Sequence, residues 1–357
     1  MKNKAFREMK KRLSLSAMKT RTPISGVYEL TSRCNLDCRM CYVHNACSNS
    51  LREKELSTDQ WKRIFEEAFD LGLIYATLTG GECLLRKDFK ELYLYLWHKG
   101  VYVSVLTNGV LLDEEYISFF KQYMPNYIQI SLYGSSEEGY KHVTGHYGFS
   151  KVVAAIQGLQ REGIDVRVTI TPSAYIRDDY INTVRFVKDN NFELVNTEMC
   201  LIPKRDDPNE TEHYLSEDDI YQLSMEKALL RGELCSIDSV PEVEGTFETA
   251  PKVGLTCSGG NCVAFVSWEG IMHPCINLLI GNASLTEMSY VEAWESTKNA
   301  ADQVVYGAEC VGCAYDKTCP KCPTFRLKDY YSGHCKPEMC RLTQRLVSGG
   351  IKKIKTD

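Results

Sequence analysis

The stretch from residue 24 to about residue 200 alternates between short apolar runs and helical patterns, and this alternation limits the possible folds most. The apolar runs, rich in Val, Ile, Leu, Tyr and Thr, are Gly26–Thr31, Ile74–Thr79, Tyr102–Thr107, Tyr127–Leu132, Asp165–Thr171 and Phe192–Met199. They show little strict alternation of apolar and polar residues, as is typical of parallel strands buried on both faces. Helical patterns fill the intervals: residues 57–69, which begin with a capping-box pattern, Asp88–His98, Asp113–Tyr123, Phe149–Glu162 and Asp178–Asp189. Six β/α units in series predict the α/β class and a partial (β/α)6 TIM-type barrel, open on one side.

The composition is that of an ordinary globular protein, with 44% hydrophobic and 25% charged residues among 357. A net charge of −5 argues against nucleic acid as the main partner. No apolar run approaches the roughly 18–20 residues of a membrane span, and the N-terminus has no apolar segment of the kind that signal peptides contain. We therefore expect a cytoplasmic protein that does not use a membrane as a partner.

Sixteen cysteines are many for such a chain, and their clustering indicates metal rather than disulfides, which are typical of short secreted scaffolds. Cys34, Cys38 and Cys41 follow the first predicted strand in a C-x3-C-x2-C run. An iron–sulfur cluster normally takes four cysteines, so three thiolates leave one iron of a four-iron cube for a small molecule. Half of a zinc site is the alternative for this spacing taken alone.

Glycine-containing motifs follow the next three predicted strands. Thr79-Gly80-Gly81-Glu82 ends the second, Thr107-Asn108-Gly109 the third, and Ser131-Leu132-Tyr133-Gly134 the fourth. Each alone is an ordinary turn. On barrel folds, however, the chemistry lies at the carboxyl ends of the strands, so the joint order predicts one site.

In these residues the chain resembles the radical S-adenosylmethionine (radical SAM) superfamily. The resemblance implies a [4Fe–4S] cluster on the three cysteines, whose open iron binds the amino and carboxylate groups of S-adenosyl-L-methionine. It also implies cofactor contacts from a set of residues at the strand ends: Met40, Thr79, Gly80, Gly81, Glu82, Thr107, Asn108 and Ser131. Met40 stands where the family often has an aromatic residue that packs on adenine, and Cys83 stands where proline is usual.

Nine of the sixteen cysteines lie between Cys257 and Cys340, in a region rich in Gly and Pro that predicts little apolar core. Their spacing resembles the SPASM extension of peptide-modifying radical SAM enzymes, which implies two auxiliary [4Fe–4S] clusters and three clusters in all. The implied ligands are Cys257, Cys262, Cys275 and Cys322 for one cluster, and Cys310, Cys313, Cys319 and Cys340, with Cys335 as the alternative to Cys340, for the other. Two structural zinc sites are the competing interpretation.

These observations divide the chain into five segments. We expect a basic N-terminal lead-in (1–23), the barrel (24–202), a connector (203–254), the small cysteine-rich SPASM domain (255–345) and a basic tail (346–357). Residues 1–21 hold eight Lys or Arg against one acid, so the lead-in is either a solvated segment or a dock for an acidic peptide or electron donor.

The resemblance implies that a 5′-deoxyadenosyl radical abstracts hydrogen from the substrate. Cys83, Glu198 and Cys200, near predicted strand ends, are candidates for the remaining acid, base or hydrogen-donor role, although Cys200 also fits a small buried apolar residue. The chemistry that we expect is maturation of a ribosomal peptide by a thioether, a carbon–carbon crosslink or an epimerisation. The expected partners are that peptide, a separate leader-recognition protein and a one-electron donor of the flavodoxin or ferredoxin type.

Three other functions share the scaffold. One is an anaerobic sulfatase-maturing enzyme, although in that group an aspartate that serves as base follows the cysteine equivalent to Cys275, and here Ile276 and Asn277 follow it. The second is a small-molecule radical SAM dehydrogenase. The third is a non-catalytic iron–sulfur electron carrier, against which the intact strand-end motifs argue.

Overall fold

The computed structural model describes residues 4–43, 45–46, 53–195, 212–234, 254–304, 313, 315, 318–319 and 337–351. Its centre is a nine-stranded sheet with the order β11-β10-β9-β1-β4-β5-β6-β7-β8. The six predicted strands are present as β1 (Ser25–Glu29), β4 (Tyr75–Thr79), β5 (Tyr102–Thr107), β6 (Tyr127–Ser131), β7 (Val166–Thr169) and β8 (Glu193–Val195). Each of these six pairs in parallel with the next, so the predicted partial barrel is confirmed.

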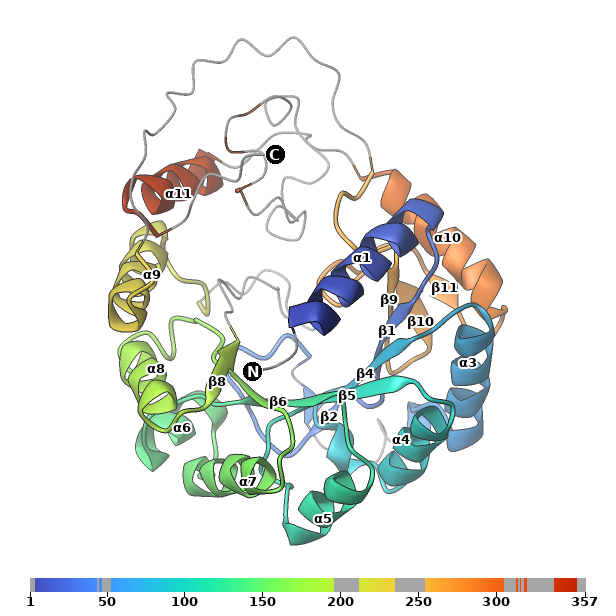
Figure 1. The fold of residues 1–357 in the computed structure, drawn as a ribbon, viewed down its shortest axis with the longest axis horizontal. Helices are drawn as coiled ribbons and strands as arrows, with labels where there is room; N and C mark the ends of the chain where they lie inside the picture. Colours follow the sequence, from blue (N-terminus) through green and yellow to red (C-terminus); the bar gives the residue numbers. More distant parts are fainter. Residues whose placement is uncertain are drawn as a thin grey trace.

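Helices cover the outer face of this curved sheet (Figure 1). They are α3 (Thr58–Asp70), α4 (Phe89–His98), α5 (Glu114–Gln122), α6 (Glu137–Thr144), α7 (Phe149–Arg161) and α8 (Tyr180–Asp189). The predicted capping box at the start of α3 is confirmed, because the Ser57 side chain accepts from the Gln60 amide and the Gln60 side chain accepts from the Ser57 amide. Helix α6 was not predicted, and its capping Ser136 is the signal that could have located it.

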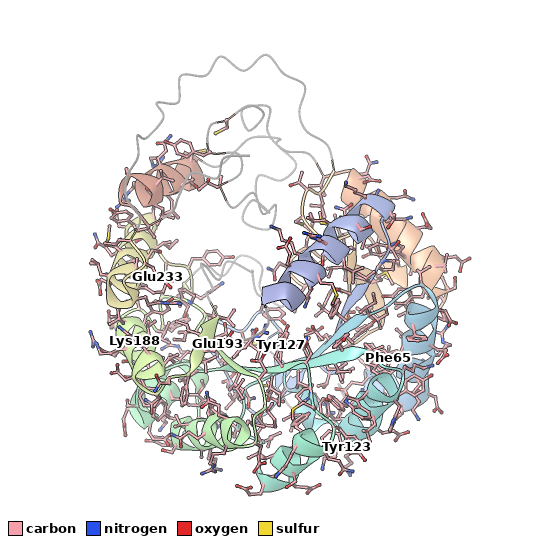
Figure 2. All side chains as sticks on the ribbon, in the orientation of Figure 1. Phe65, Tyr123, Tyr127, Lys188, Glu193 and Glu233 are labelled. Carbon is pink, nitrogen blue, oxygen red and sulfur yellow. The ribbon has the colours of Figure 1, made fainter. Side chains whose placement is uncertain are left out.

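The two faces of the sheet differ in chemistry. Tyr28 of β1 faces outward, with its ring 4.9 Å from that of Phe65 on α3, and no part of it is exposed. On the opposite face Gln129, Arg167 and Glu193 lie in register on β6, β7 and β8. Gln129 and Arg167 are half-buried, and Glu193 is exposed. Figure 2 shows Phe65 between α3 and the sheet, and Tyr127 and Glu193 toward the space that the sheet encloses. At these strands the inner face is therefore polar and partly accessible to solvent.

The basic lead-in forms helix α1 (Lys4–Thr20), which lies on the inner side of the sheet (Figure 1). The Lys10 ammonium lies 4.2 Å from the centre of the Tyr75 ring at the start of β4, and burial, helped by nearby Arg167, lowers the pKa of Lys10. Arg21, directly after the helix, forms a 2.7 Å ion pair with Asp302. Most of the described side chains of the helix are exposed, as the solvated alternative predicts, but Ala17 packs with Ile24 and Cys262 at the amino ends of the strands.

The chain after Leu255 differs from the expectation of little apolar core. Strand β9 (Val263–Val266) pairs in parallel with β1 and extends the sheet, followed by antiparallel β10 (Ile271–His273) and β11 (Ala283–Ser284) and by helix α10 (Tyr290–Asp302). Met272 and Trp294 belong to the main core. Propensity could not locate these strands because they are short, and their pairing with β1 is a long-range contact.

Helices α9 (Glu217–Arg231) and α11 (Pro337–Ser348) pack together beyond β8. Ile220, Leu342 and Leu346 form their apolar contact, and Arg345 lies 3.2 Å from the carboxylate of Glu217. Within the described ranges, the structure contains no helix that is both long and apolar enough to cross a membrane.

Candidate cofactor site

The three-cysteine loop begins where β1 ends. Cys34 lies on the short strand β2 (Arg33–Cys34), and the loop then turns so that the Cys41 amide donates to the Cys38 carbonyl at 3.0 Å. The end of α6 supports the loop, since the Asp37 amide donates to the Thr144 carbonyl at 3.0 Å. Backbone contacts on both sides of the loop hold its cysteines in place.

The three thiols share one buried neighbourhood. Burial raises the pKa of Cys34 to about 12, and the charges of Glu82 and Cys41 act in the same direction. Burial also raises the pKa of Cys38 well above its usual range, again with a contribution from Cys41 and from Cys34. Several thiolates so close together need a cationic partner, which an iron cluster supplies.

The same three thiols do not form a single-ion site. Among the residues that the structure describes, no three His, Cys, Asp or Glu side chains converge as the ligands of one metal ion do. Thiolates that bind separate irons of a cube need not converge on one point. The donor set, three cysteines without a carboxylate or histidine among them, fits a cluster with one open iron better than a zinc ion.

The Gly80-Gly81-Glu82 turn packs directly on the chain that enters this loop. The Gly81 amide donates to the Thr31 carbonyl and the Glu82 amide to the Arg33 carbonyl, both at 2.8 Å. A Cβ atom on Gly81 would lie 2.5 Å from the Arg33 carbonyl oxygen. The glycines therefore permit a close approach of two backbones, and the cofactor contacts of Gly80 and Gly81 stay a prediction.

The carboxylate of Glu82 is fully buried and occupied by protein donors. It accepts from the Thr107 hydroxyl at 2.8 and 2.9 Å, from the Asn108 amide at 2.8 Å and from the Leu84 amide at 3.0 Å. Burial raises the pKa of Glu82, and these hydrogen bonds offset part of that shift. Its side chain ties β4 to the end of β5, and the contact of Glu82 with a cofactor stays a prediction.

The motif that ends β5 reaches the cysteine loop as well. The Asn108 side-chain amide donates to the Asn35 side-chain oxygen at 2.8 Å and lies 3.7 Å from the Cys34 sulfur. Sequence reasoning did not select Asn35, although its position directly after Cys34 is a signal for it. The strand-end motifs of β1, β4 and β5 thus meet at one place, as their order along the chain predicted.

The other predicted cofactor residues surround this place. Met40 is buried within the loop, Thr79 is buried at the end of β4, and Ser131 is half-buried at the end of β6. Glu198 and Cys200 lie outside the described residues. The contacts of Met40, Thr79 and Ser131 with a cofactor stay a prediction.

Cys83 does not line the chamber, which corrects the hypothesis that it faces the cofactor. It begins the short helix η1 (Cys83–Leu85) and has no exposed surface. Its thiol donates to the Leu106 carbonyl at 3.4 Å, and burial raises its pKa well above the usual range. A neutral thiol enclosed in the core has no access to a substrate radical.

We predict that Cys83→Ala leaves S-adenosylmethionine cleavage within about twofold of the parent. The change removes one sulfur from a filled core, so a loss of about 1 kcal/mol in the free energy of unfolding is expected. Chromatography of 5′-deoxyadenosine and denaturant unfolding of the same preparation measure both quantities. Loss of cleavage with unchanged stability would restore Cys83 as a candidate hydrogen donor.

The second group of cysteines is described in part. Cys257 is exposed, Cys262 is buried and Cys275 is half-buried, and the charge of Cys257 adds to the burial that raises the pKa of Cys262. Cys275 approaches the same loop, since its Cβ lies 3.3 Å from the position of a Cβ on Gly259. The structure thus places Cys275 beside the loop that carries Cys257 and Cys262, although among the described residues no three potential ligands converge as those of one metal ion do.

The rest of that group is incomplete. Cys313, Cys319 and Cys340 are described and half-buried. Cys310, Cys322 and Cys335 lie outside the described residues. Both auxiliary ligand sets therefore stay predictions.

The fold and the site define an enzyme that binds a cofactor where neighbouring strands of a partial barrel end. Residues 28–187, which are 160 of the 357 residues, match the family model of the Radical SAM superfamily, whose members use S-adenosylmethionine and a [4Fe–4S] cluster.

Curated relatives differ in how much of the chain they match. The AdoMet-dependent heme synthase of Methanosarcina barkeri is 26% identical over 85% of this chain and 92% of its own length. The PqqA peptide cyclase of Rhizobium meliloti is 33% identical over 38% of this chain and 36% of its own length. The chain thus spans only about a third of the peptide cyclase.

Solved structures share the fold over most of the chain. Streptococcus suis SuiB bound to S-adenosylmethionine gives a TM-score of 0.66 at 14% identity, with 96% of this chain and 84% of that chain covered. Native anSMEcpe with bound AdoMet gives a TM-score of 0.66 at 17% identity, with 92% and 96% covered.

Proposed function

We propose that this enzyme modifies a ribosomally made peptide by radical chemistry. The observation that carries the proposal is that the loop of three half-buried cysteines meets the turns that end β4 and β5. When bound, the cluster and S-adenosylmethionine supply a 5′-deoxyadenosyl radical that abstracts hydrogen from a carbon of the substrate. Cys34, Cys38 and Cys41 hold the cluster, and the backbone of Gly80–Glu82 with Asn108 orients the cofactor.

The chain's own contribution is placement and the exclusion of water. The cysteine loop and both turns are fixed by hydrogen bonds before any ligand binds, so little ordering is needed on binding. The inner face of the sheet supplies polar side chains, among them Thr77, Gln129 and Ser131, that are half-buried. Such groups suit a peptide, whose backbone needs donors and acceptors throughout.

The relatives support a peptide as the substrate class. The PqqA peptide cyclase and the subtilosin biosynthesis protein AlbA of Bacillus subtilis, 33% identical over 42% of this chain, act in peptide maturation by their names. A structure of SuiB bound to its precursor peptide SuiA has the same fold, with a TM-score of 0.65. The proposal includes a separate leader-recognition protein and an external one-electron donor.

The two auxiliary clusters belong to the same proposal. Cys257, Cys262 and Cys275 with Cys322 would hold the first, and Cys310, Cys313, Cys319 and Cys340, or Cys335 in its place, the second. Four thiolates for each cluster leave no open iron, which favours acceptance of an electron from the product radical over substrate binding.

We predict that Cys262→Ala uncouples the reaction. The Cys262 carbonyl accepts from the Ser25 amide at the start of β1, whereas Cys34 follows the end of that strand, so the loop at Cys34 keeps its contacts. Iron content should fall by about four atoms per chain, 5′-deoxyadenosine should still form, and modified peptide should disappear. Unchanged iron and product would show that Cys262 is no cluster ligand.

A small-molecule substrate is the second candidate. The heme synthase relative aligns with 85% of this chain, including parts beyond the radical SAM segment, whereas the peptide cyclase aligns with 38%. The relative that matches most of the chain thus favours a tetrapyrrole substrate.

One anaerobic assay separates the two candidates. Iron-loaded enzyme, reductant and S-adenosylmethionine are incubated with peptides encoded beside the gene or with iron-coproporphyrin, and mass spectrometry measures the products. A mass change in a peptide that depends on the cofactor supports the proposal, and oxidation of the porphyrin supports the alternative. An absence of 5′-deoxyadenosine under every condition would contradict both.

A further inference from the structure

Four buried charged side chains lie beside the cysteine loop and have no part in the proposed function. We propose that Arg33, Glu55, Arg86 and Asp88 form a positioning device that sets the Cys34 thiolate relative to the glycine turn, and hence the cluster relative to S-adenosylmethionine. Their side chains are only 10%, 6%, 6% and 20% exposed, and their charges sum to zero.

The inner pair fixes the residue directly before Cys34. The Arg33 guanidinium donates to both oxygens of Glu55, from Nε at 2.8 Å and from Nη2 at 2.9 Å. The Thr31 hydroxyl donates to the same carboxylate and accepts from the Arg33 amide at 3.1 Å. A two-pronged guanidinium–carboxylate contact fixes direction as well as distance, so Arg33 has little freedom to rotate.

The outer pair fixes the chain on the far side of the glycine turn. Arg86 donates to the two oxygens of Asp88 at 2.9 and 2.6 Å, and to the carbonyls of Leu30 and Leu56 at 3.0 and 3.1 Å. Its Nη1 also lies 3.8 Å from the Glu55 carboxylate, which links the two pairs.

The quartet therefore joins three segments: the exit of β1 at residues 30–33, the chain before α3 at residues 55–58, and the turn after β4 at residues 82–88. The Glu82 amide donates to the Arg33 carbonyl, so Arg33 holds the glycine turn with its backbone and Glu55 with its side chain. A shift of Arg33 moves Cys34 on one side and the cofactor-binding backbone on the other.

Stability alone does not account for this arrangement. Burying ion pairs costs desolvation that the attraction only roughly repays, and apolar residues of similar volume often serve stability better. Ion pairs with two-pronged geometry do fix one arrangement of the chain, which is what a cofactor site requires. We infer that the quartet determines geometry, and that its loss weakens cofactor binding more than it weakens folding.

The decisive variant is Glu55→Gln, measured in full-length protein with its iron loaded. We expect the dissociation constant for S-adenosylmethionine to rise roughly 10-fold to 100-fold, the range seen when partners of metal ligands are changed. In the parent, addition of S-adenosylmethionine should change the electron paramagnetic resonance signal of the reduced cluster. We expect this change to differ in Glu55→Gln, while the iron content of the variant equals that of the parent. Both readouts are independent of turnover and of the peptide.

Glu67→Gln is the matched control. Glu67 accepts from the Tyr290 amide at the start of α10 at 2.7 Å and pairs with Arg63 on its own helix α3 at 3.1 Å. Glu67→Gln should lower the melting temperature without changing the dissociation constant or the resonance signal. If Glu55→Gln behaves in the same way as this control, the quartet only stabilises the fold and the proposal is overturned.

A second pair of variants decides the matter if Glu55→Gln does not fold. Arg33→Lys keeps the charge but loses the two-pronged contact, and it should weaken cofactor binding with iron content retained. Asp88 lies at the more exposed end of the quartet. Asp88→Asn leaves the hydrogen bonds from Arg86 to the carbonyls of Leu30 and Leu56 in place, so it should weaken cofactor binding less than Arg33→Lys does. Equal, parent-like affinity in both variants would also overturn the proposal.

Discussion

Cys38→Ala is expected to abolish the formation of 5′-deoxyadenosine and to remove about four iron atoms per chain. The loop supplies only three thiolates, so the loss of one leaves two irons of the cube without a protein ligand. The charge of Cys41 contributes to the raised pKa of both Cys34 and Cys38, so the three thiols act as one donor set. The effect should therefore be a loss of the cluster and not a reduced rate.

Chromatography of the nucleoside and iron analysis of anaerobically purified protein measure the two effects. Cys83→Ala is the matched control, because it makes the same substitution at a cysteine that is fully buried in the core and is not one of the three thiols of the loop. A Cys38→Ala enzyme that cleaves the cofactor at the parent rate would refute the three-cysteine site. Parent-like iron content without cleavage would show instead that Cys38 acts after cluster assembly.

The parts that sequence predicted best are those fixed by local signals. Strand β5 has the bounds that its apolar run predicts, and helix α3 begins at the predicted cap. The order of motifs at strand ends also predicted that Cys34, the glycine turn and Asn108 meet, because parallel strands bring their carboxyl ends to one edge.

What sequence missed depends on contacts between distant segments. The role of Gly81 can be predicted only if its turn is known to pack on Arg33. The burial of Cys83 can be predicted only if β5 is known to lie beside it. Strand β9 acquires its place by pairing with β1, more than 230 residues earlier in the chain. The pattern of basic residues before Ile24 did not predict that the Lys10 ammonium would lie over the Tyr75 ring.

Gly81→Ala should damage the site strongly although it adds only one methyl group. Its Cβ would lie 2.5 Å from the Arg33 carbonyl oxygen and 2.6 Å from that of Ser32, and backbone atoms cannot rotate away. The turn must withdraw, which breaks the bonds from Gly81 to Thr31 and from Glu82 to Arg33. Overpacking at about 1–3 kcal/mol and two hydrogen bonds at about 1 kcal/mol each predict a loss of roughly 3–5 kcal/mol in the free energy of unfolding.

Gly163→Ala controls for the added methyl group. Gly163 has φ +74° but nothing within 4 Å of the position of a Cβ, so Gly163→Ala should cost about 1 kcal/mol and leave cleavage intact. Denaturant unfolding and the nucleoside assay compare the two variants, and a Gly81→Ala enzyme as stable and active as Gly163→Ala would show that the turn does not need its contact with the cysteine loop.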